Sequence, residues 1–268
     1  MLFYKIHSCG NDYIVVDAET DIDYSSLAVK ICDRMTGVGA VGVIVVKNDP
    51  LELVLYNPNG QISSVNGSAL CSFGLYCFKK DLYIKNKLTV KCSLGEIKIE
   101  LLDEEIFKCR IEIGKPDFSN QKIFVGDQIN SFGRVLSVEG YRLTTYSFYL
   151  NSIETVVFVE SLDGEVIDCA KLISNKSLFK NGTNVNFVKL LNNGKIEVKS
   201  YKNKQGFVPC SSFGACASVV AGHKLEILKT KVEVACELEN IIVDINRKGV
   251  VLLTSGATYV FEGIYKEE

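Results

Sequence analysis

The alternation of apolar and polar residues along the chain predicts that most of it folds into short strands. Residues 42–60 have the pattern of a strand, a turn at Asn48-Asp49-Pro50 and a returning strand that ends in Tyr56. Residues 187–205 repeat this pattern, with a turn at Asn192-Asn193-Gly194. Further strands are predicted over 88–101, 107–113, 231–237, 240–245 and 249–253.

Four segments have helical spacing instead. Residues 65–78 and 210–223 each predict a loop with small residues that opens a helix. Two shorter helices are predicted over 25–35 and 165–174. Each would turn one apolar face inward, formed by Leu27, Ile31, Cys32 and Met35 in one helix and by Val166, Cys169, Leu172 and Ile173 in the other.

The two halves of the chain repeat each other. At an offset of 145 residues, GVIVVKNDPLELVLYNPNG (42–60) falls on FVKLLNNGKIEVKSYKNKQ (187–205). At the same offset VNGSALCSFGLYCF (65–78) falls on CSSFGACASVVAGH (210–223), which aligns Cys71 with Cys216. DYIVVDAE (12–19) also resembles ETVVFVES (154–161). Three ordered matches predict a duplicated unit of about 110–130 residues, with a pseudo-two-fold relation between the halves.

The repeat defines the predicted fold class, which is α/β (α+β) with two duplicated domains. Each half would be a mixed, mostly antiparallel sheet around a central helix. We place the boundary near Gly114-Lys115-Pro116, with an N-terminal half over 1–115 and a C-terminal half over 116–256. The C-terminal strand, 257–268, would complete the first half.

Composition excludes several classes of function. With a net charge of −2, the chain lacks the excess of positive charge that binds nucleic acid or an anionic membrane. Apolar runs stay shorter than the roughly 18 residues that span a bilayer, and the N-terminus lacks a signal-peptide pattern. Ten cysteines without a CxxC pair do not resemble a zinc site. We therefore expect a cytoplasmic protein with reduced thiols and no metal.

The two predicted loop-to-helix junctions suggest an anion site. A helix N-terminus presents unpaired backbone N–H groups and a partial positive charge. If two equivalent junctions face each other across an interdomain cleft, their backbone N–H groups would bind a carboxylate. The alternative is that both are merely helix starts.

At these junctions the sequence resembles the diaminopimelate epimerase family. KIHSCGNDYIVVD (5–17) is similar to the family's opening, and GTNVNFV (182–188) and LLTSGATYVFEG (252–263) are similar to its later signatures. NPNGQISSVNGSALCSFGLY (57–76) and GFVPCSSFGACAS (206–218) resemble its two active-site motifs. The resemblance implies an amino-acid epimerase that needs no pyridoxal phosphate or other cofactor. In such enzymes one cysteine thiolate removes the α-proton and a second cysteine thiol returns one from the other face.

This chain departs from that pattern at the catalytic positions. Asn66 and Ser211 stand where the family has its two cysteines, and the 145-residue offset equates them independently. An amide has no usable basicity, and a serine hydroxyl needs an adjacent base. Other residues of the family pattern are also replaced. Lys202 and Asn203 stand where the family has an acidic residue followed by arginine, and Ile153-Glu154 stands where it has Pro-His. Val41 replaces an acidic residue, and Gly206-Phe207-Val208, followed by Pro209, replaces Gly-Glu-Thr.

The substrate-binding amides of the family are retained. Asn11, Asn57 and Asn184 match its substrate-binding asparagines. Backbone donors at Gly67, Ser68, Ser212 and Phe213 need no particular side chain.

A displaced thiol is the remaining route to catalysis. Cys210 adjoins Ser211 and could act in its place, whereas Cys71 lies five residues after Asn66, about 7.5 Å along the helix, and is expected in the core.

Three hypotheses follow. The first is a divergent member that binds a small amino acid or related carboxylate in the interdomain cleft, with two-cysteine epimerisation lost or strongly impaired. The second is an active epimerase of the lysine and peptidoglycan precursor pathway that uses displaced groups. The third is a non-catalytic structural or partner homologue. A small molecule is the expected partner, without nucleic acid or membrane, and a homodimer is left open.

Overall fold

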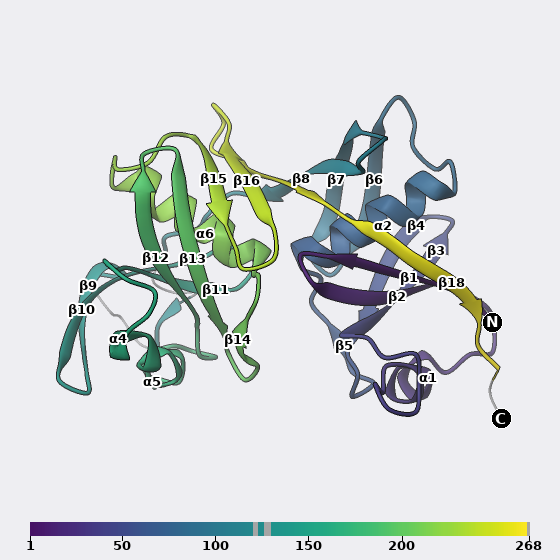
Figure 1. The fold of residues 1–268 in the computed structure, drawn as a ribbon, viewed down its shortest axis with the longest axis horizontal. Helices are drawn as coiled ribbons and strands as arrows, with labels where there is room; N and C mark the ends of the chain where they lie inside the picture. The colour runs from purple at the N-terminus through teal and green to yellow at the C-terminus, as the bar shows by residue number, and fades with distance from the viewer. Residues whose placement is uncertain (120–122, 126–129, 267–268) are drawn as a thin grey trace. The chain divides into compact units, whose positions relative to one another are not determined.

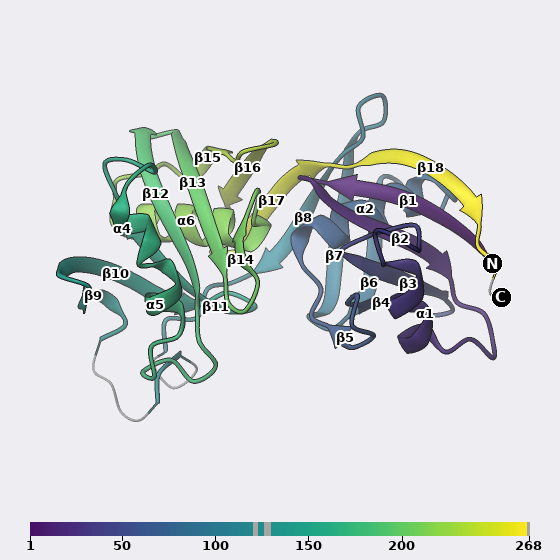
Figure 2. The same cartoon turned by 60° about the horizontal axis from the view of Figure 1, so that its bottom comes forward.

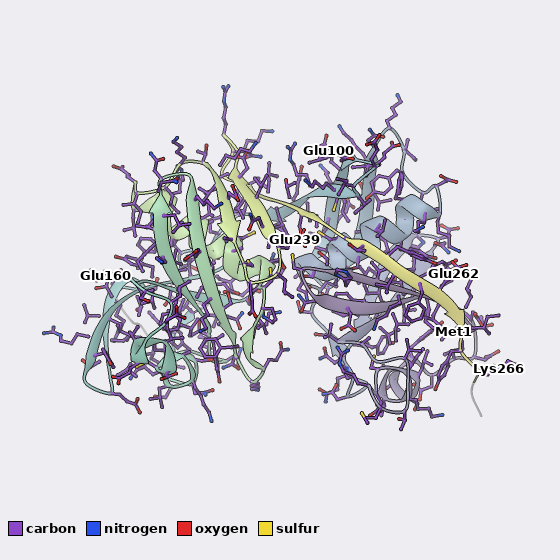
Figure 3. All side chains as sticks on the ribbon, viewed as in Figure 1. Met1, Glu100, Glu160, Glu239, Glu262 and Lys266 are labelled. Atoms are coloured by element: carbon purple, nitrogen blue, oxygen red, sulfur yellow. The ribbon has the colours of Figure 1, made fainter. Side chains whose placement is uncertain are left out.

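The computed structural model describes residues 1–119, 123–125 and 130–266. The chain divides into two compact units. The first unit comprises Met1–Glu112 and Thr254–Glu268, and the second comprises Ile113–Leu253. Met1 and Lys266 are labelled close together in Figure 3, and the Met1 ammonium donates to the Tyr265 carbonyl at 3.0 Å.

In the first unit a mixed sheet surrounds one long helix (Figure 1). The strand order from one edge is β18, β1, β2, β3, β4, β6, β7 and β8. Two neighbouring pairs are parallel, β2 with β3 and β4 with β6. The elements are β1 (Leu2–Ser8), β2 (Asn11–Asp17), α1 (Tyr24–Ile31), β3 (Gly42–Asn48), β4 (Leu51–Tyr56), β5 (Ile62–Ser63), α2 (Gly67–Lys79), β6 (Lys87–Cys92), β7 (Gly95–Asp103), β8 (Lys108–Gly114) and β18 (Thr258–Ile264).

The second unit repeats this topology. Its strand order is β9, β10, β11, β12, β13, β15 and β16, and the parallel pairs are β11 with β12 and β13 with β15. The elements are β9 (Phe132–Val138), β10 (Tyr141–Tyr149), β11 (Ile153–Phe158), α4 (Glu165–Asp168), α5 (Ala170–Ser174), β12 (Asn184–Asn192), β13 (Lys195–Lys202), β14 (Gly206–Val208), α6 (Ser212–Lys224), β15 (Lys231–Ala235), β16 (Asn240–Ile245) and β17 (Val251–Gly256).

The predicted α/β fold class is confirmed, and the duplication is visible in the connections. In each unit a short strand, β5 or β14, leads into the central helix. Residues 67–77 of α2 and residues 212–222 of α6 are all buried. Such complete burial explains the small residues in both segments, because the surrounding strands leave little room for side chains. Outside this core α1 packs on the opposite face of the sheet, against Val43 and Val45 (Figure 2).

The 145-residue offset holds for only part of the repeat. Tyr56 pairs with Ile62 on β5, and Tyr201 pairs with Phe207 on β14, so both strands keep the offset. On its other side, however, Tyr56 pairs with Val43, whereas Tyr201 pairs with Val185, only 142 residues later. The second hairpin contains an additional residue pair and a bulge between Leu190 and Asn192. The ungapped alignment of 42–48 with 187–193 is therefore wrong.

The predicted helix over 25–35 is too long. α1 ends at Ile31, and Met35 is 91% exposed rather than part of the apolar face. The Asp33 carboxylate accepts the backbone N–H groups of Met35 at 2.9 Å and Thr36 at 2.7 Å. Such a side-chain-capped turn competes with continuation of the helix.

Two other expectations also need correction. The helix over 165–174 is divided into α4 and α5 at Cys169, and Leu172 is 44% exposed. The single strand over 88–101 is instead a hairpin, in which β6 and β7 pair around Cys92 and Gly95.

Candidate functional site

Asn66 is the N-cap of α2, with its backbone extended before the first helical turn. Its side-chain oxygen accepts the Ala69 N–H at 3.0 Å and the Tyr13 hydroxyl at 3.1 Å. Tyr13 is buried, and its burial raises the pKa of the phenol, so the hydroxyl remains a donor. The amide oxygen is therefore engaged by two hydrogen bonds and cannot accept a substrate proton.

Ser211 is the N-cap of α6 and is buried. Its hydroxyl accepts the Gly214 N–H at 3.1 Å. The histidine nearest in sequence, His223, lies in the last turn of the same helix, about 18 Å further along its axis. His223 therefore cannot serve as the base that a serine nucleophile requires.

The prediction that Asn66 and Ser211 begin the two central helices is confirmed. Each side chain caps the backbone N–H three residues later. Asparagine and serine are among the best N-cap residues. Both residues are therefore well suited to begin a buried helix.

The cysteine nearest to Asn66 is structural. Cys71 is fully buried, and its sulfur lies 3.7 Å from that of Cys109. The hydrogen bond to Cys109 and burial raise the pKa of the Cys71 thiol well above its ordinary value. The expectation that Cys71 is a core residue is confirmed. Cys210 is also buried, at 2% exposure, directly before the N-cap of α6. Its catalytic role remains a prediction.

The three predicted asparagines lie in different settings. In the first unit the Asn11 amide donates to the Ser68 hydroxyl at 3.2 Å, so the β1–β2 turn contacts the start of α2. Asn57 belongs to the turn after β4, where its backbone N–H donates to the Gln61 carbonyl at 2.9 Å. In the second unit Asn184 donates to Glu154 at 2.8 Å.

Glu154 is a residue that the sequence did not identify as part of a site. It is completely buried on β11. Its carboxylate accepts Ser152 at 2.7 Å, Asn184 at 2.8 Å and Asn186 at 2.7 Å. Burial raises the pKa of Glu154, against the effect of these three donors. The two asparagines of GTNVNFV, spaced two apart, were the available signal, because alternate residues of a strand face the same side.

Lys202 lies near this carboxylate on β13. Burial lowers the pKa of Lys202, and the Coulombic interactions with Glu154 and with the ionised form of Cys210 act in the opposite direction. A polar cluster therefore adjoins the start of α6, formed by Glu154, Asn184, Asn186, Ser200 and Lys202. The residue after Lys202 is oriented differently, because the Asn203 amide donates to the Ser174 hydroxyl at 2.8 Å.

A charged network in the first unit is centred on Asp12. Arg34 and Lys5 both donate to Asp12, at 2.7 Å each. Although burial raises the pKa of Asp12, these two cations hold it below its ordinary value. The network ties the segment after α1 to β1 and β2, which is a structural role.

A hollow of about 480 Å³ also lies in the first unit, against β4 and β5. Tyr24, Val54, Tyr56 and Ile62 contribute to its lining, and none of the predicted site residues does. Within the described parts of the chain, no group of three metal-ligating side chains could hold an ion. No helix in the same parts has the length and hydropathy to span a bilayer.

Comparisons with known proteins agree with the motifs. The family model for diaminopimelate epimerase matches residues 3–118. The diaminopimelate epimerase of Caldanaerobacter subterraneus subsp. tengcongensis is 30% identical over 270 residues, covering 98% of each chain. That of Clostridium perfringens is 28% identical and covers 99% of each.

Solved structures share the fold at low identity. A probable proline racemase from Agrobacterium radiobacter with bound carbonate has a TM-score of 0.71 at 11% identity, covering 100% of this chain and 93% of the other. A hydroxyproline epimerase from Agrobacterium vitis, with bound trans-4-hydroxy-L-proline, has a TM-score of 0.67 at 12% identity, with coverages of 98% and 91%. The fold is thus one that racemases and epimerases use.

Proposed function

Since the chain belongs to the diaminopimelate epimerase family, we propose that it binds a small amino acid or related carboxylate and has lost two-thiol epimerisation. The observation that carries the proposal is the state of the two catalytic positions. Asn66 and Ser211 are both N-caps whose side-chain oxygens are occupied by backbone N–H groups. Neither side chain supplies a base.

The helix starts support retention of binding. The Asn66 side chain caps only the Ala69 N–H, and its carbonyl accepts the Leu70 N–H at 3.0 Å. The amides of Gly67 and Ser68 have no partner within the helix. The second unit repeats the arrangement, leaving the amides of Ser212 and Phe213 for a ligand carboxylate.

The loss of the thiols removes a specific chemical step. Epimerisation requires one group to remove the α-proton and another to deliver a proton from the opposite face. An asparagine amide and a capped serine hydroxyl perform neither task near neutral pH. Helix dipoles can still stabilise a carboxylate, but such binding alone does not move a proton.

The test is hydrogen exchange at the α-carbon. Incubated with LL-diaminopimelate in D₂O, the protein should incorporate no deuterium above background, as measured by NMR or mass spectrometry. The Caldanaerobacter relative, assayed in parallel, is the positive control. In a thermal-shift assay carboxylates should nevertheless raise the unfolding temperature, because ligands that bind the folded state stabilise it.

Exchange at an enzymatic rate would instead favour an epimerase with a displaced base. Cys210 is the first residue to test, because it adjoins Ser211 and is close enough to Lys202 for a Cys210 thiolate to interact with the Lys202 charge. A Cys210→Ala variant that loses the exchange would identify it. If neither exchange nor stabilisation by any carboxylate occurs, the protein is a non-catalytic structural or partner homologue.

A further inference from the structure

Three adjacent strands of the second unit bring polar residues to one face. Glu154 on β11 pairs with Asn184 on β12, and Val185 pairs with Tyr201, so Lys202 lies opposite Asn184 on β13. Alternate residues of a strand face the same side. Lys202 therefore shares a face with Ser200, whose hydroxyl lies beneath α6 near Gly214.

The side-chain acceptors of this cluster already accept hydrogen bonds from protein donors. Glu154 accepts three hydrogen bonds and is 0% exposed. The Asn184 side-chain oxygen accepts the Asn203 N–H at 3.0 Å. The Asn186 oxygen accepts the Ser200 hydroxyl at 2.7 Å. Glu154 and Asn186 are 0% exposed, so a ligand ammonium would not reach their oxygens, and the half-buried Asn184 oxygen already has a donor.

One strong donor, in contrast, is unused. The Lys202 ammonium makes no hydrogen bond or ion pair with any residue that the structure describes. It carries three N–H donors, and burial partly removes them from water, which is the cause of its lowered pKa. The Lys202 side chain is half-buried, so a ligand oxygen could replace the hydrogen bonds to water that burial removes.

We propose that this cluster binds the acidic end of the ligand and rejects a second ammonium group, with Lys202 as the residue that determines specificity. The ligand class is then a dicarboxylate with at most one amino group. This inference rests on the proposed function. A diaminopimelate molecule could place its distal carboxylate at Lys202, but its distal ammonium would meet the like charge of Lys202 and no acceptor that it could reach.

The experiment compares two ligands with the same carbon chain. We expect isothermal titration calorimetry to give an affinity for L-2-aminopimelate at least about tenfold higher than that for diaminopimelate, because an unsatisfied buried charge costs at least that much. Lys202→Met should weaken 2-aminopimelate binding by about tenfold or more and abolish the preference. Lys202→Arg should retain the preference, since it keeps the charge.

A matched control lies on the same strand. Lys199 is exposed on the opposite face, 5.5 Å above the ring of Phe207, and Lys199→Met should leave both affinities unchanged. The preference should also decline as the pH rises through the pKa of Lys202, which lies below the ordinary value of 10.5. Lys202→Arg, which stays charged, should retain more of the preference at high pH than the wild-type protein, and a structural role for Lys202 would not produce that difference.

The outcomes separate the two proposals. If the wild-type protein binds both ligands equally or diaminopimelate more tightly, the specificity inference is overturned and the proposed function stands. The specificity inference is likewise overturned if Lys202→Met leaves the affinity ratio unchanged. If the wild-type protein binds neither ligand, both proposals are overturned. The wild-type comparison is decisive even if a variant fails to fold.

Discussion

The two units place chemically opposite residues at equivalent positions of the same backbone. The strand pairings and the helix starts identify five pairs of equivalent residues. In each pair the residue of the first unit comes first: Tyr13 and Glu154, Ile44 and Asn186, Leu55 and Ser200, Asn57 and Lys202, and Ala69 and Gly214. The first unit has uncharged, mostly apolar residues here. The second unit has a carboxylate, an ammonium and their hydrogen-bonding partners.

The difference shows how a duplicated fold specialises. Ile44 and Leu55 pair beneath α2 as ordinary core residues, whereas Asn186 and Ser200 pair beneath α6 and hydrogen-bond to each other. A buried polar network is acceptable only when its members are satisfied. In the second unit Glu154 is hydrogen-bonded, and the Lys202 ammonium remains available for a ligand. At the equivalent positions the first unit has only neutral side chains.

The largest expected effect on the free energy of unfolding comes from substituting the helix residue that lies over the paired strand residues, which is Gly214 in the second unit and Ala69 in the first. A Cβ at Gly214 would collide with the Asn186 side-chain oxygen and lie 2.7 Å from the Ser200 hydroxyl. Gly214→Ala should therefore lower the free energy of unfolding by up to about 3 kcal/mol, since overpacking also disturbs the network around Glu154. The equivalent Ala69→Gly in the first unit should cost only about 1 kcal/mol. Urea unfolding measures both, and equal losses would contradict the comparison.

A smaller difference is expected for the two strand residues. Glu154→Gln replaces an acceptor oxygen with an N–H₂ group facing the donors of Asn186 or Asn184, which should cost about 2 kcal/mol. Tyr13→Phe removes a single hydrogen bond to Asn66 and should cost about 1 kcal/mol. If Tyr13→Phe proved the more damaging change in the same assay, the first unit would contain the more demanding polar contact.

The buried carboxylate of the second unit should make stability fall as the pH rises, the opposite of the effect of Asp12 in the first unit, whose pKa is lowered. The pKa of Glu154 is raised in the folded state above its ordinary value of 4.5. The folded protein therefore binds more protons between pH 4.5 and that raised value, and its stability falls as the pH rises through this window. Glu154→Gln should flatten this part of the stability profile. An unchanged slope would assign the effect to another group.

The two N-caps should show nearly symmetrical effects. Asn66→Ala and Ser211→Ala each remove a side-chain cap from a fully buried helix, which typically costs about 1 kcal/mol. Asn66→Ala should cost somewhat more, because the Tyr13 hydroxyl also loses its acceptor. Thermal unfolding of both variants would reveal whether either cap is dispensable.

The smallest expected effect is on activity. Restoring both thiols with Asn66→Cys and Ser211→Cys should yield little or no epimerisation of diaminopimelate, as assayed by circular dichroism. Lys202 and Asn203 still replace the acidic-arginine pair, and a misplaced substrate alone can cost about 10²-fold in rate. Full activity from the double variant would show that the charged cluster of the second unit does not exclude this substrate.

Sequence alone determined the features that depend on local chemistry. Asn66 and Ser211 were correctly placed at helix starts because an N-cap acts on the backbone only three residues away. The duplicated fold could be predicted because two copies of one pattern reinforce each other. The local prediction failed for Met35, where the Asp33 carboxylate ended the helix early.

Only the tertiary structure decided what surrounds these helix starts. Glu154 meets Asn184 and Asn186, about 30 residues later, through the parallel pairing of β11 with β12, and Lys202 joins them from a third strand. No periodicity within one strand specifies which strand it will pair with or in which register. The bulge between Leu190 and Asn192 shifted that register by an amount the repeat did not reveal. Side-chain charge can be read along the chain, but whether a charge finds a partner depends on residues brought together by folding.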